Sequence, residues 1–368
     1  MNRRLRDYGI VIGRGTPGPR NKITDVAGVT VGHCTVDTDR NKTGVTVIMP
    51  CPDNPFSRKL AAAVCIQNGF GKSQGLTQIE ELGTLETPIA LTNTLNVGIV
   101  HDSLVDYMLK VGERDGISIT SVNPVVGECN DSILNDISCR AVGRKEVMEA
   151  IDSAAAEFEE GDVGAGKGTV CFGLKGGIGS ASRIVSLGGK DYTIGALVQS
   201  NFGVTENLVI GHEPVGRKLS GIEPAVTDRG SVMMILATDL PVTDRQLKRM
   251  CRRAPVGLAR CGSFLGHGSG DIVIGFTTVN RVETGKEPAV CSIEVLKEEL
   301  LDQVFPAVAE SVEEAVLNSL AMASTVTGYD GTKKYSLTEV YLSRLQAEQT
   351  TGRTGGQTKE PHIPETPL

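Results

Sequence analysis

Ser231 stands where a polar segment meets an apolar one, in the stretch TDRGSVMMILATDLP (227–241). A serine hydroxyl becomes a nucleophile only when a base takes its proton, and neither Ser-x-x-Lys nor Gly-x-Ser-x-Gly surrounds this residue. Cleavage of the Gly230–Ser231 bond would release an α-amine, with an unperturbed pKa of about 7.7–8, as that base. The alternative is ordinary: small residues are common where a loop enters a strand. We favour self-cleavage at Gly230–Ser231, which gives one residue both functions.

Other motifs do not support nucleotide or metal chemistry. The stretch GFGKS (69–73) lacks the first glycine of a P-loop, because Ile66 occupies that position. The glycine runs at 164–169 and 176–182 lack the context of a dinucleotide site, although such runs also bring backbone N–H groups close to an oxyanion. The five histidines, including His267 in GHGSGD, show no metal-ligand spacing. We therefore predict no cofactor and no metal.

Composition narrows the class of protein. The 368 residues carry a net charge of −7 and only 4% aromatic side chains, which disfavours a nucleic-acid partner. The basic run KRMCRR (248–253) is interpreted as the solvated face of a helix. Nine scattered cysteines without C-x-x-C fit a reducing compartment, and neither a signal peptide nor an apolar membrane-spanning run is visible. These features predict a cytoplasmic protein with no membrane partner.

The elements that position Ser231 follow from hydrophobic periodicity. Short apolar runs that end in Gly or Pro predict strands, and amphipathic runs predict helices separated by a polar loop at 204–230. The predicted helices cover 101–116, 144–161, 243–262 with an N-cap at Thr243 or Asp244, and 296–323 as two helices meeting near Pro306. The predicted strands include 116–128, 192–203, 231–241 and 271–282. Together they indicate a layered α/β or α+β body.

At this point the sequence resembles a known family, the L-aminopeptidase/D-amidase (DmpA) and β-peptidyl aminopeptidases, which are autoprocessed peptidases of the N-terminal-nucleophile type. The resemblance extends over 5–340 and rests on ordered blocks. These include NKITDVAGVTVGH, NGFGKSQGL, TNTLNVG, PVVGECND, GAGKGTVCFGLKGGIGSASR, LVQSNFG, the RGS seam and GLARCGSFLGHGSGDIVIGFTT. It implies an α/β fold, namely a four-layer α/β/β/α sandwich like that of N-terminal-nucleophile hydrolases. It also implies one catalytic domain over 1–344, cut into 1–230 and 231–368, followed by a polar, disordered tail at 345–368.

The resemblance also assigns roles to residues. Ser231 matches the new N-terminal nucleophile, and Ser269 and Asp271 in GSGD match the serine and acidic residue that contact the nucleophile and orient its α-amine. Asn201 in QSNFG matches the asparagine that helps form the oxyanion hole. Without the family, GSGD would be interpreted as a turn before a strand, and Asn201 as a turn residue at a strand end.

One departure concerns the substrate pocket. The family has a tyrosine near the substrate in the region that matches ECNDSILND (128–136), where this chain has Ile133 or its neighbours instead. Glu128 or Asp131 could hold the ammonium group that an aminopeptidase must recognise in its substrate.

The leading prediction is a self-processing serine aminopeptidase or amidase. It would release N-terminal residues from short peptides, amides or esters through an acyl-enzyme on Ser231. Alternatives on the same fold are a hydrolase of non-peptide oligoamides and an acyltransferase, although acyltransferases of this layering use a threonine nucleophile. An inactive binding protein is a third possibility, against which Ser231, Ser269, Asp271 and Asn201 speak together. By resemblance, we expect a homo-oligomer such as a tetramer.

Overall fold

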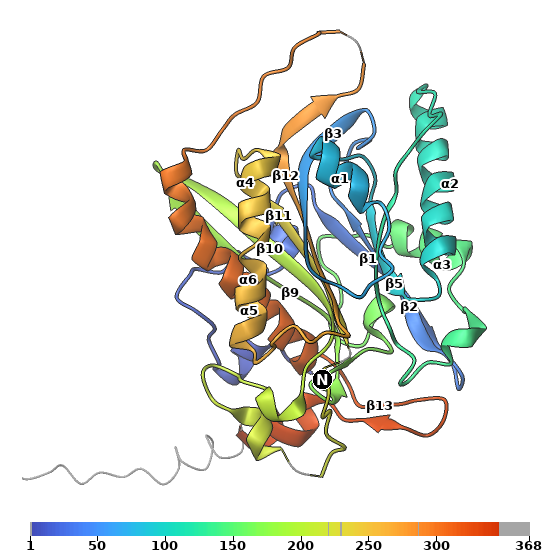
Figure 1. The fold of residues 1–368 in the computed structure, drawn as a ribbon, viewed down its shortest axis with the longest axis vertical. Helices are drawn as coiled ribbons and strands as arrows, with labels where there is room; N and C mark the ends of the chain where they lie inside the picture. Colours follow the sequence, from blue (N-terminus) through green and yellow to red (C-terminus); the bar gives the residue numbers. More distant parts are fainter. Residues whose placement is uncertain (1, 220, 229, 286, 346–368) are drawn as a thin grey trace, which may run out of the picture.

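The protein stacks two β-sheets face to face and covers each outer face with helices (Figure 1). The computed structural model describes residues 2–219, 221–228, 230–285 and 287–345. The predicted tail therefore lies outside the described residues from 346 onward. No helix in these ranges is both long enough and apolar enough to cross a bilayer.

The larger sheet carries the seam at Ser231. Its six strands are β3 (Arg58–Gly69), β4 (Thr84–Leu85), β9 (Gly177–Leu187), β10 (Lys190–Asn201), β11 (Ser231–Thr238) and β12 (Gly270–Glu283). They are arranged in the order β4-β3-β12-β11-β10-β9. Neighbours run antiparallel except β11 and β12, which are parallel and therefore begin at the same end of the sheet.

The smaller sheet has the order β1-β2-β5-β6. Its strands are β1 (Thr30–Asp37), β2 (Lys42–Met49), β5 (Ile89–Asn93) and β6 (Val125–Cys129). Side chains such as Ile48, Leu91, Met233, Ile274 and Phe276 form a core between the two sheets. Alternate residues of β11, including Val232 and Met234, instead pack against the helices, as the two-residue period of a strand requires.

Two helical layers complete the sandwich. Helices α4 (Asp244–Cys251), α5 (Ala254–Arg260) and α6 (Leu301–Ala321) cover the larger sheet, and α2 (Val97–Asp115) and α3 (Arg144–Asp152) cover the smaller one (Figure 1). The short helix α1 (Leu76–Leu82) follows β3. Short strand pairs are β7 (Val170–Cys171) with β8 (Leu174–Lys175) and β13 (Val326–Thr327) with β14 (Lys333–Lys334). The predicted four-layer α/β/β/α sandwich is confirmed.

The prediction of two helices meeting near Pro306 is wrong. Helix α6 is continuous, with Pro306 in its second turn on the exposed side. The missing N–H leaves the carbonyl of Asp302 without its helical donor, but Asp302 is itself exposed, so this carbonyl is open to solvent. On its buried side, α6 receives the fully buried Arg183 of β9, whose guanidinium pairs with Glu310 at 3.1 Å and Glu314 at 2.7 Å.

The helix predicted over 144–161 ends early, at Asp152. Its N-terminus is stabilised by Glu146, whose side chain accepts the Gly143 N–H at 2.8 Å. Beyond the helix, the chain pairs with β1 through Ala155 and buries Phe158 against the core between the sheets. The apolar residues that extended the predicted helical face therefore pack elsewhere.

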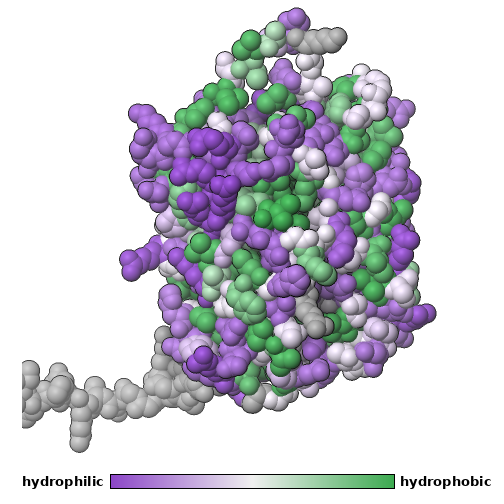
Figure 2. Space-filling model, in the orientation of Figure 1, coloured by the Kyte–Doolittle hydropathy of each residue, from purple (hydrophilic) through white to green (hydrophobic). Residues whose placement is uncertain are grey.

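The helix predicted over 243–262 is two helices, because Pro255 in the first turn of α5 has no N–H for the Cys251 carbonyl and its ring would clash with that carbonyl in a continuous helix. Of the two predicted N-caps, Thr243 fills that position, where its hydroxyl accepts the Gln246 N–H at 3.2 Å. In the run 248–253, the four basic side chains are half-buried or exposed at α4 and just after it, where Figure 2 shows strongly hydrophilic surface, whereas Met250 and Cys251 are buried. Its Lys248 pairs with Glu80. The predicted solvated face is therefore confirmed for Lys248 and Arg252, while Arg249 and Arg253 pack over the ring of Phe305.

Two further predictions need correction. In the run 116–128, only the end is a strand, because Pro124 lacks the N–H that a ladder needs and β6 starts at Val125. The described part of loop 204–230 contains no long strand, but it is not simply exposed. Thr205 and Val215 are buried in it, and Asp228 is only 8% exposed.

Candidate active site

Four strand termini meet at one end of the larger sheet, the lower end in Figure 1. Strand β10 ends at Asn201, which pairs with Ser231 at the start of β11. Ser231 pairs in turn with Gly270 at the start of β12, and Asp271 pairs with Asn68 near the end of β3. The parallel β11–β12 pair is the cause, since it places both strand starts at the same end. Three of the four predicted catalytic residues, Asn201, Ser231 and Asp271, thus lie at the ends of the adjacent strands β10, β11 and β12. The fourth, Ser269, directly precedes β12.

Ser231 is 5% exposed and lies directly opposite Asn201 across the antiparallel pair. Residues opposite each other in this way point to the same face of a sheet. That face is the one between the two sheets, where the buried Cys129 at the end of β6 lies near Ser231 and its thiol donates to the Gln199 carbonyl at 3.5 Å. Gly230 is required before it, because a Cβ at that position would collide with the carbonyl oxygen of Asn201. The Gly230–Ser231 peptide is therefore packed closely against the end of β10.

Asn201 is oriented by the glycine-rich loop that follows residue 163. Its Oδ1 accepts the Val170 N–H at 2.9 Å, which leaves its NH₂ group as the donor available to the site. Lys175 fixes this loop from inside, donating through Nζ to the carbonyls of Gly166, Thr169 and Gly176 at 2.7–2.8 Å. Burial lowers the pKa of Lys175 to about 7, and the three carbonyl acceptors match the three protons of its charged form.

Ser269 and Asp271 form a buried pair. The Ser269 hydroxyl donates to Asp271 Oδ1 at 2.6 Å, and Asp271 Oδ2 is buried without a hydrogen-bond partner. Burial raises the pKa of Asp271 to about 6; the Ser269 hydrogen bond opposes this rise, and the charge of Asp228 adds to it. Asn68 holds the loop before β12 by donating to the Ser269 carbonyl at 2.6 Å. The chain is continuous through Ser231, so its nitrogen is a peptide N–H here and an α-amine exists only after cleavage.

The two candidate ammonium ligands lie in different surroundings. Glu128 is adjacent to Cys129 and accepts the Lys72 N–H at 2.9 Å and the Thr94 hydroxyl. The same loop brings Gly71 against Gly270, so Glu128 belongs to the end of the sheet that holds Ser231. By contrast, Asp131 is only 1% exposed and accepts from the side chain of Asn135 at 3.0 Å. Burial raises the pKa of Asp131 to about 6.

A cavity of about 440 Å³ adjoins the seam. It is lined by Asn201 and Gly230, by Ile133 with its neighbours Asn130 and Ser132, and by apolar groups of Val170, Phe202, Pro224, Ala225 and Val226. Ile133 is 46% exposed and supplies part of the wall of this cavity. An apolar cavity beside a nucleophile and a few polar groups is the usual form of a substrate site.

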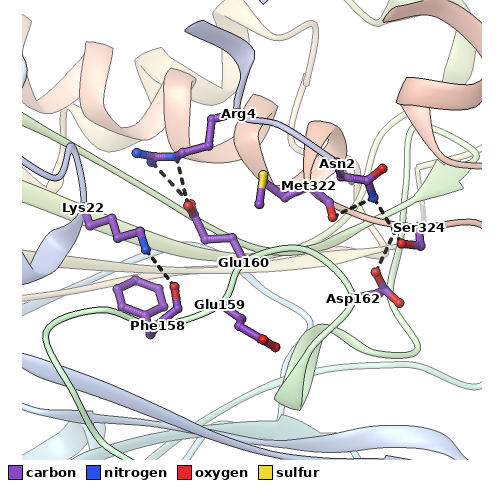
Figure 3. A pocket seen from close by; sticks show the side chains of 9 residues that line it. All are labelled: Asn2, Arg4, Lys22, Phe158, Glu159, Glu160, Asp162, Met322 and Ser324. Carbon is purple, nitrogen blue, oxygen red and sulfur yellow. Dashed lines mark hydrogen bonds and ion pairs between the residues drawn. The ribbon is translucent and has the colours of Figure 1, made fainter. Parts of the chain in front are cut away.

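A second cavity of about 580 Å³ involves none of the predicted site residues (Figure 3). Arg4 pairs there with Glu160 at 2.9 Å, and Lys22 donates to the Phe158 carbonyl at 2.7 Å. Lys22 also pairs with Glu157, and Asp162 with Lys167, so most of the charged groups of this cavity already have a partner. Elsewhere in the described ranges, no three His, Cys, Asp or Glu side chains come together in a way that could hold a metal ion.

Sequence reasoning missed several residues of this site. In the sequence, Cys129 has the surroundings of an ordinary core cysteine, and Lys175 belongs to no motif with a known function. Asn68 lies in NGFGKS, which drew attention as a failed P-loop rather than as the end of a strand. Asp228 stands two residues before the seam, but its polar neighbours indicated only an exposed loop.

A serine at the first residue of a central strand, within an α/β/β/α sandwich, is the arrangement typical of N-terminal-nucleophile hydrolases. A protein-family model for peptidase family S58 matches residues 21–334. The chain therefore belongs to peptidase family S58, and it is a hydrolase of the serine aminopeptidase class.

Individual relatives agree with this assignment. The chain is 37% identical to the β-peptidyl aminopeptidase BapA of Sphingosinicella xenopeptidilytica, over 93% of this chain and 90% of that protein. The structure of the PH0078 protein from Pyrococcus horikoshii OT3 is 47% identical, with a TM-score of 0.88 over 95% of this chain and 99% of that one. The L-aminopeptidase D-Ala-esterase/amidase of Ochrobactrum anthropi, described as a prototype serine aminopeptidase with a variant Ntn-hydrolase fold, is 36% identical. Its TM-score is 0.88 over 95% of this chain and 99% of that one.

Proposed function

We propose that the chain cuts itself between Gly230 and Ser231 and then acts as an aminopeptidase through Ser231. In the first step, the Ser231 oxygen attacks the Gly230 carbonyl, the C–N bond breaks and the hydroxyl proton ends on the released nitrogen. Water then hydrolyses the ester, which leaves a Gly230 carboxylate and a Ser231 with a free α-amine and a free hydroxyl. Before that amine exists, ionised Asp271, acting through Ser269, serves as the acid–base group beside the seam.

In the mature enzyme, the α-amine of Ser231 takes the hydroxyl proton as the oxygen attacks the substrate carbonyl. The NH₂ group of Asn201 donates to the developing oxyanion. The leaving amine receives the proton, and water releases the acyl group from Ser231. Ser269 and Asp271 hold the α-amine in place during both halves of the reaction.

The observation that carries this proposal is the pairing of Ser231 with Asn201 on one side and Gly270 on the other, beside a required glycine. The test is the mass of the purified wild-type protein under denaturing conditions, together with hydrolysis of a panel of aminoacyl p-nitroanilides. Two fragments that correspond to 1–230 and 231–368, with measurable hydrolysis, support the proposal. A single full-length chain without activity would refute it.

For the substrate, we propose a short peptide or amide with a free N-terminal amine, including β-amino acid residues like those named for the BapA relative. Glu128 is the group that binds this amine, because its neighbour Cys129 lies near Ser231 and its carboxylate lies beside Gly71, which packs against Gly270. The Asp131 carboxylate instead accepts from the Asn135 side chain. The Ile133 side chain forms part of the wall of the apolar cavity. A cytoplasmic location and a homo-oligomer remain predictions.

We expect Glu128→Gln to raise KM for amine-bearing substrates by roughly 10–100-fold, about 1.4–2.7 kcal/mol, because a charged hydrogen bond to the ammonium group is lost. Steady-state kinetics on β-alanyl and L-alanyl p-nitroanilides, with the cleaved fraction measured by mass, give this value. The comparison variant is Asp131→Asn, for which we expect a change in thermal stability without this rise in KM. Equal KM values for wild type and Glu128→Gln would remove Glu128 from this role.

A further inference from the structure

Asp228 precedes the seam and joins the two strands that flank β11. Its Oδ1 accepts the Gly203 N–H at 3.0 Å, and its Oδ2 accepts the Gly266 N–H at 3.3 Å. Gly203 follows the end of β10, and Gly266 lies in the loop that leads to Ser269 and β12. One buried carboxylate thus ties the segment entering β11 to both of its neighbouring strands.

The contact is closely fitted on both sides. Gly203 has φ +97°, and a Cβ there would collide with the ring of Phe172. A Cβ on Gly266 would collide with Asp228 itself, and the preceding Leu265 adopts φ +57°, which is uncommon for a residue with a side chain. Such geometry persists only where the surroundings enforce it. The donors therefore reach Asp228 because glycine occupies both positions.

We infer that Asp228 is a positioning residue for self-cleavage, which holds the Gly230 carbonyl at the end of β10 and tunes the Ser269–Asp271 pair. This inference rests on the proposed function. Removing a buried charged acceptor leaves two backbone N–H groups without their partner, so the segment loses its anchor at both strands. A carboxylate, rather than any other side chain, also acts on Asp271 through its negative charge.

The negative charge of Asp228 raises the pKa of Asp271, which gives the proposed cleavage a pH dependence of known direction. Asp228 disfavours ionised Asp271, and ionised Asp271 is the form proposed to assist cleavage. The other groups around Asp271 are the Cys129 thiol, whose pKa Asp271 helps to raise, and the neutral Ser269 and Asn68. Cleavage should therefore accelerate as pH rises through about 6, the pKa of Asp271. Without the charge of Asp228, this midpoint moves to lower pH.

The experiment compares wild type, Asp228→Asn and Glu213→Gln. Each full-length chain is made by cell-free translation, so that cleavage can be followed from the uncut chain. Cleavage is followed by mass over time from pH 4.5 to 8.5. Glu213 is the matched control, a carboxylate in the same loop whose exposed side chain pairs with Lys218. We expect Asp228→Asn to slow cleavage at least tenfold at pH 8 and to lower the midpoint, while Glu213→Gln matches wild type.

Cleavage of Asp228→Asn within twofold of wild type would overturn the inference, as would slowing with an unchanged midpoint. If that variant fails to fold by circular dichroism, Asp228→Glu keeps the charge and alters only the reach. It should be slowed at an unchanged midpoint, whereas a wild-type rate would overturn the inference. An uncut wild-type chain is a different result, because it contradicts the proposed function itself.

Discussion

Replacement of Ser231 by alanine is expected to leave a single full-length chain and to abolish hydrolysis. Ser231→Ala removes the oxygen that attacks Gly230 and, without cleavage, the α-amine never forms. Loss of a serine nucleophile costs about 10⁶ in kcat in enzymes where it has been measured. Denaturing mass spectrometry reports the cut, and p-nitroanilide hydrolysis reports the activity.

The matched variant is Ser231→Cys. Cysteine is similar in size to serine, carries a nucleophilic side chain and would also expose an α-amine after cleavage. We expect it to cleave itself, at a reduced rate, because a thiol is intrinsically a strong nucleophile. Ser231 is buried at the end of a sheet, so thermal unfolding of both variants must match wild type for the comparison to hold. Fragments from Ser231→Ala at the 230–231 bond would contradict the assignment of the nucleophile.

The second large effect concerns Asn201. We expect Asn201→Ala to lower kcat by about 10²–10³ with little change in KM, because an oxyanion donor acts mainly on the transition state. The same substitution leaves the Val170 N–H without its acceptor, at a cost of about 1–3 kcal/mol in stability. Steady-state kinetics on the cleaved enzyme and urea unfolding measure the two effects separately.

Asn201→Asp separates the two roles of this side chain. Its carboxylate still accepts from Val170 but offers no N–H to the oxyanion, and its negative charge opposes the charge that develops there. The variant should therefore approach wild type in stability while losing kcat at least as severely as Asn201→Ala. Near-wild-type kcat in both variants would assign Asn201 to structure alone.

The strands at 192–203, 231–241 and 271–282 could be predicted from their clear apolar patterns, whereas the four-layer order came from the family resemblance. Prediction from the sequence failed where tertiary contacts override local periodicity. Phe158 fits a helical face, yet it fills space between the sheets, and Pro306 lies on the one side of α6 where water can replace a backbone donor. Neither the burial of Phe158 between the sheets nor the exposure of Pro306 can be predicted from the residues next to them in the sequence.

The site divides in the same way. The seam at Ser231 stands out because a glycine, a serine and a buried strand follow a polar loop. The neighbours of the site come from distant segments, and their roles depend on register: Asn68 matters because β3 pairs with β12, and Cys129 because β6 faces β11. Spacing along the chain carries no trace of such pairings, and only the family resemblance placed Asn201 beside Ser231.

Because β11 and β12 are adjacent, the proposed cleavage would give two polypeptides, 1–230 and 231–368, that share the larger sheet. A cut before β11 frees a chain end between two hydrogen-bonded neighbours, and the sheet then alternates by origin: β3 and β4 from the first piece, β12 and β11 from the second, β10 and β9 again from the first. The buried pairing of Arg183 with Glu310 and Glu314 also crosses the division. Separating the pieces would mean dismantling the common core, so the proposed cleavage would give two polypeptides that stay together in one fold.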